Sequence, residues 1–122
     1  MKTIKGNPNT PTIHLNPQKG ILKIEGRSFP PEPKFFYTSL EKIIKHKEWK
    51  LPINIQINLD YIETISSRYL LAFLKDLVKN YSVNSIEWIF EEDDEDIQEL
   101  GNLYAKILHV SNFKMTQVIS PI

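Results

Sequence analysis

The fold is decided by residues 53–68, INIQINLDYIETISSR, where an alternating strand runs into a hydroxyl-rich helix start. From Ile53 to Asp60, apolar and polar residues alternate with the period of two that is typical of a strand with one buried face. A strand enclosed between two helix layers would be apolar at nearly every position. The pattern therefore predicts a sheet with its helices on one face only.

Working outward, the same reasoning predicts strands and helices in the order β-β-α-β-α-β-α-β. The expected strands are Thr12–Leu15, Ile21–Glu25, Ile53–Asp60, Val83–Phe90 and Phe113–Ile119. The expected helices are Phe35–Glu48, a second from about Thr64 to Tyr81, and Asp94–Leu108. Strand–helix–strand units place their strands parallel, whereas the first two strands form a hairpin around a turn at Gly20. We therefore predict a mixed α/β sheet.

The chain length fits one folded domain, which we place at residues 12–122. Residues 1–11 are polar and contain Asn, Pro and Thr, so we expect them to form a flexible N-terminal arm. The Pro-rich segment 29–33 is expected to be a non-helical connector to the first helix, because proline removes a backbone donor and restricts the residue before it.

Composition and charge exclude several classes of protein. The chain has no cysteine, which rules out disulfides, thiolate metal sites and a Cys nucleophile. Its 15 basic residues balance 15 acidic ones, so it lacks the basic excess of most nucleic-acid-binding proteins. No signal peptide or membrane-spanning apolar run is present, and we expect a cytoplasmic protein with neither nucleic acid nor membrane as a partner.

The usual signatures of catalysis and cofactor binding are also absent. Gly occurs at only four positions, and none belongs to a phosphate loop, a dinucleotide fingerprint or a Ser-nucleophile elbow. The three histidines, His14, His46 and His109, lack zinc-ligand spacing. The acidic run 91–96 lacks the spacing of a calcium loop and fits a solvated helix start. We therefore expect no enzyme activity, no cofactor and no metal.

Gly101 is unusual because it falls in the middle of the third predicted helix. Glycine there costs about 1 kcal/mol relative to alanine. Its presence predicts that another group packs closely against it, or that the helix bends at this point.

The remaining candidate for function is the hydroxyl cluster of Thr64, Ser66 and Ser67. Ser and Thr at a helix start commonly cap the helix, and this structural use of all three hydroxyls stays open. The alternative is reversible phosphorylation, because a helix start favours negative charge. If Thr64 caps the helix, Arg68 lies one turn further on and could contact a phosphate on Thr64. Asp60 would oppose that phosphate by charge repulsion.

Several short motifs, taken in order, resemble the SiaC family of bacterial regulatory phosphoproteins. They cover nearly the whole chain and are Thr10-Pro11-x-Ile13, Gly20-x-Leu22, Gly26-x-Ser28-x-Pro30, Tyr61-Ile62-x-Thr64-x-Ser66, Trp88-x-Phe90 and Asp96-Ile97-x-Glu99-x-Gly101. The resemblance implies a two-layer fold similar to STAS domains, the anti-sigma factor antagonists. It differs at Glu63, where Asn is more usual, and at Ile65, which interrupts the polar cluster.

The same resemblance implies a function. Thr64 would be phosphorylated by a partner Ser/Thr kinase and restored by a PP2C-type phosphatase. The unphosphorylated protein would bind and activate a diguanylate cyclase, which links it to cyclic-di-GMP and biofilm formation. Ser66 and Ser67 are alternative acceptors, and Tyr61, Glu63 and Arg68 form the expected docking surface.

Three other hypotheses remain open at this stage. The chain could be a small ligand- or metal-binding domain that uses His14 or the acidic run 91–96. It could be an anti-sigma factor antagonist that acts in transcription control. The polar sheet face with Asn54, Gln56 and Asn58 could also be an assembly surface.

Overall fold

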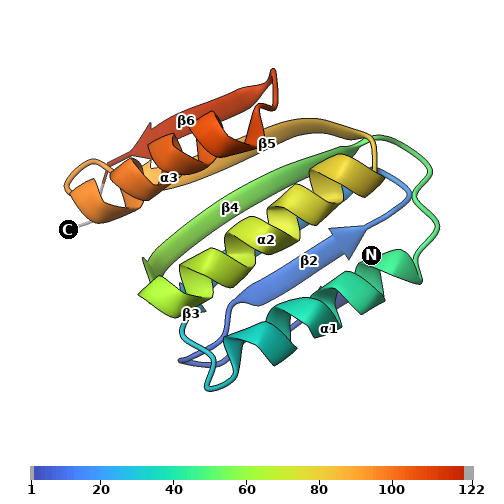
Figure 1. The fold of residues 1–122 in the computed structure, drawn as a ribbon, viewed down its shortest axis with the longest axis horizontal. Coiled ribbons are helices and arrows are strands. Elements are labelled where there is room, and N and C mark those ends of the chain that lie inside the picture. The colour runs from blue at the N-terminus through green and yellow to red at the C-terminus, as the bar shows by residue number, and fades with distance from the viewer. Residues whose placement is uncertain (1, 120–122) are drawn as a thin grey trace.

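The computed structural model describes residues 2–119, which form one six-stranded sheet and three helices (Figure 1). The strands are β1 (Lys2–Ile4), β2 (Thr12–Asn16), β3 (Ile21–Ser28), β4 (Ile53–Ile62), β5 (Val83–Glu91) and β6 (Phe113–Val118). The helices are α1 (Pro33–Lys45), α2 (Thr64–Asn80) and α3 (Glu95–Leu108). The strands follow one another across the sheet in chain order.

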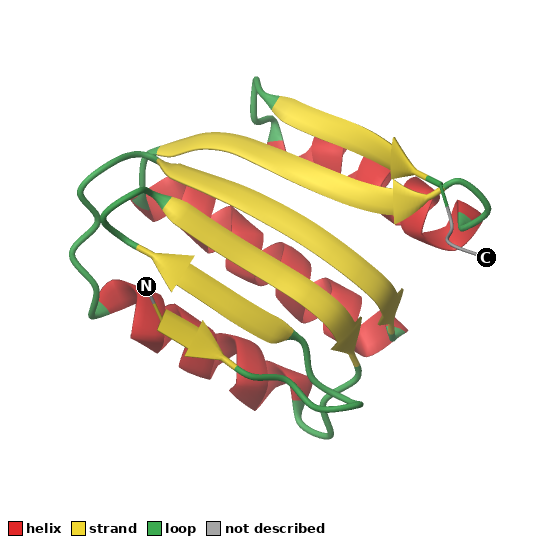
Figure 2. Cartoon of the chain, turned by 180° about the vertical axis from the view of Figure 1, so that it is seen from behind, coloured by secondary structure: helices red, strands yellow, loops and turns green. Residues whose placement is uncertain are grey.

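The sheet is mixed, as the sequence predicts. Strands β1, β2 and β3 pair antiparallel, while β3, β4, β5 and β6 pair parallel. Each parallel connection contains one helix, so the helices follow the order of the strands. Seen from behind, the sheet is uncovered and all three helices lie on its far side (Figure 2). The predicted one-faced sheet is therefore confirmed.

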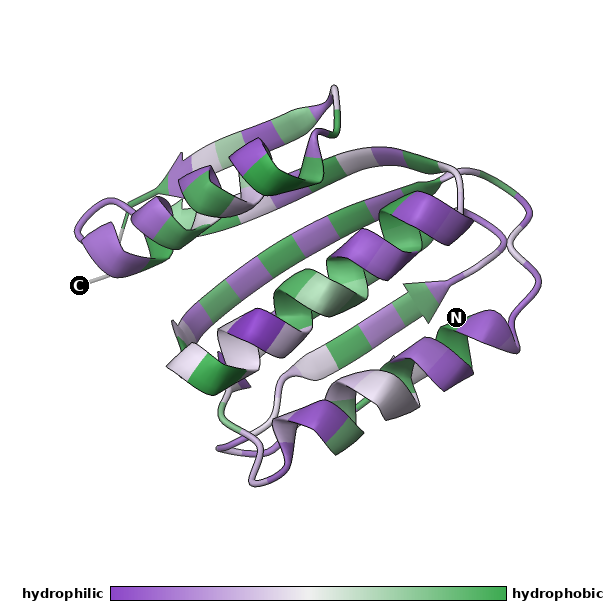
Figure 3. Cartoon of the chain, viewed as in Figure 1, coloured by the Kyte–Doolittle hydropathy of each residue, from purple (hydrophilic) through white to green (hydrophobic). Residues whose placement is uncertain are grey.

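The alternation along β4 explains this arrangement. The side chains of Ile53, Ile55, Ile57 and Leu59 are at most 3% exposed, and the polar residues between them are less buried. Hydropathy colours show the same alternation along the strand (Figure 3). Burying one such row removes apolar surface from water on the helix side only, so a second helix layer would have nothing apolar to cover.

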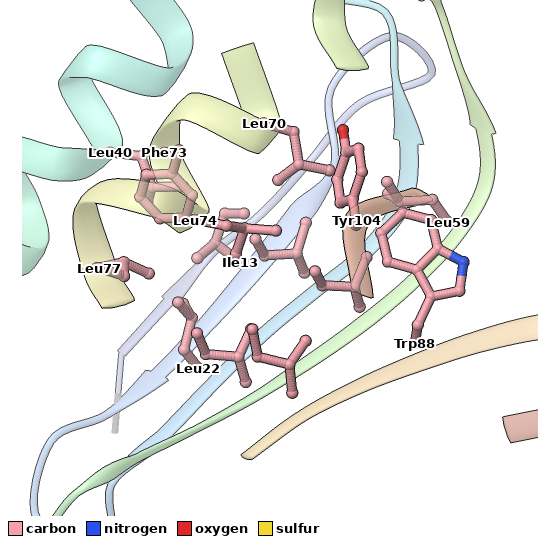
Figure 4. Packing of buried hydrophobic residues seen from close by; sticks show 14 of the residues in the cluster. Ile13, Leu22, Leu40, Leu59, Leu70, Phe73, Leu74, Leu77, Trp88 and Tyr104 are labelled. Atoms are coloured by element: carbon pink, nitrogen blue, oxygen red, sulfur yellow. The ribbon is translucent and has the colours of Figure 1, made fainter. Parts of the chain in front are cut away.

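The core lies between the sheet and the helices (Figure 4). Its largest fully buried side chains are Trp88, Tyr37, Tyr104 and Phe73. The Tyr37 hydroxyl shares a hydrogen bond of 2.6 Å with the Ser28 hydroxyl, which satisfies two buried polar groups at once. Burial raises the pKa of Tyr37 to about 12, so it remains a neutral phenol that can hold α1 to the end of β3.

Two predictions about the N-terminal third of the chain are wrong. Lys2–Ile4 is a strand rather than part of a flexible arm, because its backbone pairs with the free edge of β2 and Ile4 packs on the core. Helix α1 begins at Pro33, inside the segment predicted to be non-helical. Proline is tolerated there because an N–H group at the first helical position has no hydrogen-bond acceptor within the helix.

Gly101 allows α3 to lie directly against β5 and β6. A Cβ atom at this position would come within 2.4 Å of Trp88 Cδ1 and 2.8 Å of Met115 Cε. The Trp88 indole donates a hydrogen bond of 2.9 Å to the Ile97 carbonyl in the same helix. The close packing that the sequence predicts at Gly101 is therefore confirmed.

We expect Gly101→Ala to lower the free energy of unfolding by about 1–3 kcal/mol, because overpacking must displace the Trp88 indole. Alanine's better helix propensity would by itself change stability by about 1 kcal/mol in the opposite direction. Urea denaturation followed by tryptophan fluorescence measures the result. Asn102→Ala, at the next and exposed position, is the matched control and should not destabilise the protein. Equal stabilities for the two variants would contradict this packing.

The uncovered face of the sheet carries polar side chains that bond to one another. The Glu87 carboxylate accepts hydrogen bonds from Gln56 (2.9 Å) and Thr116 (2.7 Å) on the strands at either side. These two bonds hold the pKa of Glu87 below its ordinary value of 4.5. Asn54 likewise accepts bonds of 2.8 Å from Asn84 and Ser85. The polar face thus connects β4, β5 and β6 through side chains as well as backbone.

Because folding lowers the pKa of Glu87, its contribution to stability is present above pH 4.5 and is lost as the pH falls through the lower folded value. We expect Glu87→Gln to be less stable than wild type near pH 7, with the difference shrinking toward pH 3. Urea midpoints across this range measure it. Glu99→Gln, at an exposed position on α3, is the control. A difference that grows on acidification would contradict this reasoning.

Candidate functional site

The candidate site is the junction where β4 ends at Ile62 and α2 begins at Thr64. Glu63 is the cap residue of α2, and its carboxylate accepts a hydrogen bond of 2.9 Å from the Ile65 N–H. The Glu63 N–H donates to the Ser28 carbonyl at 3.1 Å, which fixes the junction to the end of β3. Capping by Thr64, one of the two uses that the sequence leaves open, is therefore ruled out, because the Glu63 carboxylate already fills that role.

The three hydroxyls differ sharply in accessibility. Thr64 is exposed, Ser67 is half-buried, and Ser66 is fully buried. The Ser67 hydroxyl donates to the Thr64 carbonyl at 2.7 Å, and the Ser66 hydroxyl has no hydrogen-bond partner among residues 2–119. Capping by Ser66 or Ser67, which the sequence leaves open beside their role as alternative acceptors, is not what the structure shows, because Glu63 caps α2. Thr64 is thus the hydroxyl that another protein can reach most readily.

The first turn of α2 is also held from the side of α3. The Tyr104 hydroxyl donates to the backbone carbonyl of Ser67, and its ring packs edge-on against Trp88 with centroids 5.1 Å apart. Burial raises the pKa of Tyr104, so the phenol keeps the proton that it donates. The tyrosine therefore ties the turn that carries Thr64 to the core.

A groove of about 430 Å³ opens beside Thr64. It is lined by Asp60, Tyr61, Ile62, Thr64, Ser67, Asp94, Asp96, Ile97 and Leu100. Three of these residues are carboxylates, and none is basic. A phosphate on Thr64 would therefore meet negative charge in the groove, while Arg68 lies one turn further along the exposed side of α2.

The expected docking residues lie around this junction. Tyr61 is 40% exposed, and its ring is edge-on to Phe29, which is 43% exposed, with centroids 5.9 Å apart. The Arg27 guanidinium lies 5.0 Å from the centroid of the Tyr61 ring, within range of a cation–π contact. No local sequence pattern marks Phe29 or Arg27 as part of this site. Only the pairing of β3 with β4, which sets Arg27 beside Tyr61, brings them to the site.

The residues of the ligand-binding hypothesis have structural partners. His14 contacts Glu25 at 2.9 Å and Thr3 at 3.3 Å, and Asp94 caps α3 by accepting from the Ile97 N–H at 3.1 Å. Within residues 2–119, no group of three or more His, Cys, Asp or Glu side chains could hold a metal ion. No helix in the same range has the length and apolar character needed to cross a bilayer.

The structure thus gives an α/β domain with an exposed threonine at the start of its second helix. The model of the SiaC family of regulatory phosphoproteins matches residues 4–118. The chain therefore belongs to the SiaC family. A search of curated proteins finds no significant match.

Solved structures agree with this assignment. A chain in the crystal structure of the diguanylate cyclase SiaD with its activator SiaC, from Pseudomonas aeruginosa, superimposes with a TM-score of 0.82 at 20% identity, covering 97% of this chain and 100% of that chain. A structure of SiaC from the same organism gives 0.80, also at 20% identity and with the same coverage. Apo-SiaC gives 0.71 at 21% identity, covering 95% and 99%. At these identities the likeness shows a shared fold.

We expect Ser66→Ala to fold at least as stably as wild type, because it removes a buried hydroxyl without a partner. Urea denaturation measures the change, and Ser28→Ala, which breaks the buried bond to Tyr37, is the contrasting control. The Ser28 variant should lose about 1–3 kcal/mol, since it leaves the Tyr37 hydroxyl unpaired. A comparable loss in the Ser66 variant would show that its hydroxyl is in fact bonded.

Proposed function

We propose that this protein is a non-enzymatic phospho-switch whose modified residue is Thr64. A Ser/Thr kinase phosphorylates Thr64, and a PP2C-type phosphatase removes the phosphate. The unphosphorylated protein binds an effector, which we take to be a diguanylate cyclase. The kinase and phosphatase follow from the family resemblance, and the effector follows from the relative that is described as the activator of SiaD.

The observation that carries the proposal is the exposure of Thr64 at the first position of α2. A kinase must bring the acceptor hydroxyl to the γ-phosphate of ATP, so a hydroxyl at the surface is a better substrate than a buried one. Ser66 would have to leave the core first. Ser67 is half-buried, and its hydroxyl already bonds the Thr64 carbonyl. These features rank Thr64 above the two alternative acceptors.

The charges around Thr64 favour a switch that turns binding off. A phosphate brings a charge of about −1.5 to −2 at neutral pH. Glu63 already occupies the Ile65 N–H at the start of α2, so the phosphate cannot take that donor without displacing a carboxylate. It therefore stays at the surface, near exposed Tyr61 and one helical turn from Arg68. A partner that packs on Tyr61 and neutral Thr64 would lose packing and desolvation energy when the phosphate is added.

The test compares Thr64→Glu with Thr64→Ala in binding to the purified cognate diguanylate cyclase. We expect Thr64→Glu to abolish binding and Thr64→Ala to retain it, because only glutamate adds a charge at the interface. Titration calorimetry and the rate of cyclic-di-GMP synthesis both measure the effect.

The acceptor itself is located by fragment-ion mass spectrometry after incubation with the cognate kinase. Thr64→Ala should remove the modification, and the matched variant Ser67→Ala should keep it. Phosphorylation that persists in Thr64→Ala, or equal cyclase binding by the glutamate and alanine variants, would place the switch elsewhere.

A further inference from the structure

The charged residues of this electrically balanced chain are separated between the two ends of the helix layer. Helices α1 and α2 together carry six basic residues and only two acidic ones. The basic residues are Lys34, Lys42, Lys45, Arg68, Lys75 and Lys79, and the acidic ones are Glu41 and Asp76. The segment from Glu91 to Leu108, which includes α3, carries seven acidic residues and one lysine. The molecule is therefore strongly polarised.

The six basic residues lie on two adjacent helices, and we call the solvent-exposed side of α1 and α2 the basic helix face. Glu41 of α1 and Asp76 of α2 interact between the two helices, where burial and the neighbouring Asp76 raise the pKa of Glu41. All six basic residues are exposed, and α1 and α2 lie next to each other on the same side of the sheet (Figure 1). On α2, Thr64, Arg68, Lys75 and Lys79 follow the spacing of a single helical stripe, so the candidate phosphorylation site is the N-terminal end of this stripe. Both ion pairs found within residues 2–119 lie outside the two helices.

We propose that the basic helix face binds an acidic segment of the effector protein, an inference that rests on the proposed function of Thr64. Charge complementarity identifies this occupant, because a row of cations attracts and orients a segment rich in Asp and Glu. Phe35 and Ile65, which are 69% and 53% exposed at the N-terminal ends of α1 and α2, offer apolar contacts along the same face. The segment therefore carries apolar side chains among its carboxylates.

The acidic side of the molecule distinguishes a protein segment from larger polyanions. Helix α3 packs beside α2 and presents Glu95, Asp96 and Glu99 to solvent. An anionic membrane is far wider than two helices of about 10–12 Å each, so it would bring negative charge against these carboxylates. A nucleic-acid duplex is an alternative occupant that the binding test below separates from a protein segment. A single chain segment can follow α1 and α2 without reaching them.

Phosphorylation would change the charge at the end of the basic helix face where Thr64 lies. Arg68 is one turn from Thr64, so a phosphate there can pair with it and remove a cation from the effector's contact surface. Lys79 is about 22 Å further along the helix than Thr64, which exceeds the Debye length of about 8 Å at physiological salt. The C-terminal part of the stripe thus contributes to binding without sensing the phosphate.

This separation provides the test. The variant Lys75→Glu/Lys79→Glu reverses charge on the basic helix face far from Thr64, and Lys19→Glu/Lys23→Glu makes the same change at exposed positions on the β2–β3 hairpin. Binding of each unphosphorylated protein to the purified cognate diguanylate cyclase is measured at about 50 mM and 300 mM salt. Circular dichroism and thermal unfolding first establish that both variants are folded.

We expect the helix variant to bind at least about tenfold more weakly at low salt and the hairpin variant to stay within about twofold of wild type. Wild-type affinity should fall as salt rises. Equal affinities for the helix variant and wild type would overturn the inference. A second outcome would also overturn it. In that outcome, wild type binds anionic phospholipid vesicles or a DNA duplex, the helix variant loses this binding, and the affinity of the helix variant for the cyclase is unchanged.

Kinase treatment of the same variants separates this inference from the proposed function. Both variants should still be phosphorylated on Thr64, because the substitutions are distant from it. If wild type is not phosphorylated there, or if the phosphorylated protein binds the cyclase as well as the unmodified one, the proposed function fails. If phosphorylation of wild type abolishes cyclase binding as proposed, but the unphosphorylated helix variant binds the cyclase as tightly as wild type, then only the inference about the basic helix face fails.

Discussion

The one-sided burial of β4 is the constraint on which the rest of this structure depends. Because its isoleucines face the helices and its polar residues face outward, α1, α2 and α3 must share one side of the sheet. Each parallel crossover then returns to the same end of the sheet, and the starts of α1, α2 and α3 lie there together. Thr64 is at the centre of this row, because α2 follows the central strand β4.

Side-chain hydrogen bonds hold the same end of the sheet in a fixed shape. Tyr37 reaches from α1 to Ser28, and Tyr104 reaches from α3 to the carbonyl of Ser67. The Ser28 carbonyl in turn accepts from the N–H of Glu63, directly before α2. The hydroxyl groups of two buried tyrosines thus brace the junction from both sides. Both phenols stay protonated because burial raises their pKa values, so this bracing does not change across the physiological pH range.

The sequence predicted those features that depend on local periodicity or on one residue's special chemistry. The mixed sheet, the single helix layer and the close approach at Gly101 are of this kind. Strand β1 was missed because Lys2–Ile4 has no alternation of its own and is ordered by the edge of β2. Contacts such as that of Tyr104 with Ser67 join residues far apart in the chain, and no local pattern reports them.

The candidate site shows how a general preference can mislead at one position. Ser and Thr are favoured caps, yet here Glu63 fills that role and its carboxylate bonds the Ile65 N–H. The Thr64 side chain makes no hydrogen bond within residues 2–119, and Thr64 is exposed. In the proposed switch, a phosphate on Thr64 would then break none of the hydrogen bonds found within residues 2–119. We therefore expect the first turn of α2, which Tyr104 and Glu63 hold in place, to keep its conformation. The signal would be read by the partner as a change in surface charge, with no conformational change inside the domain.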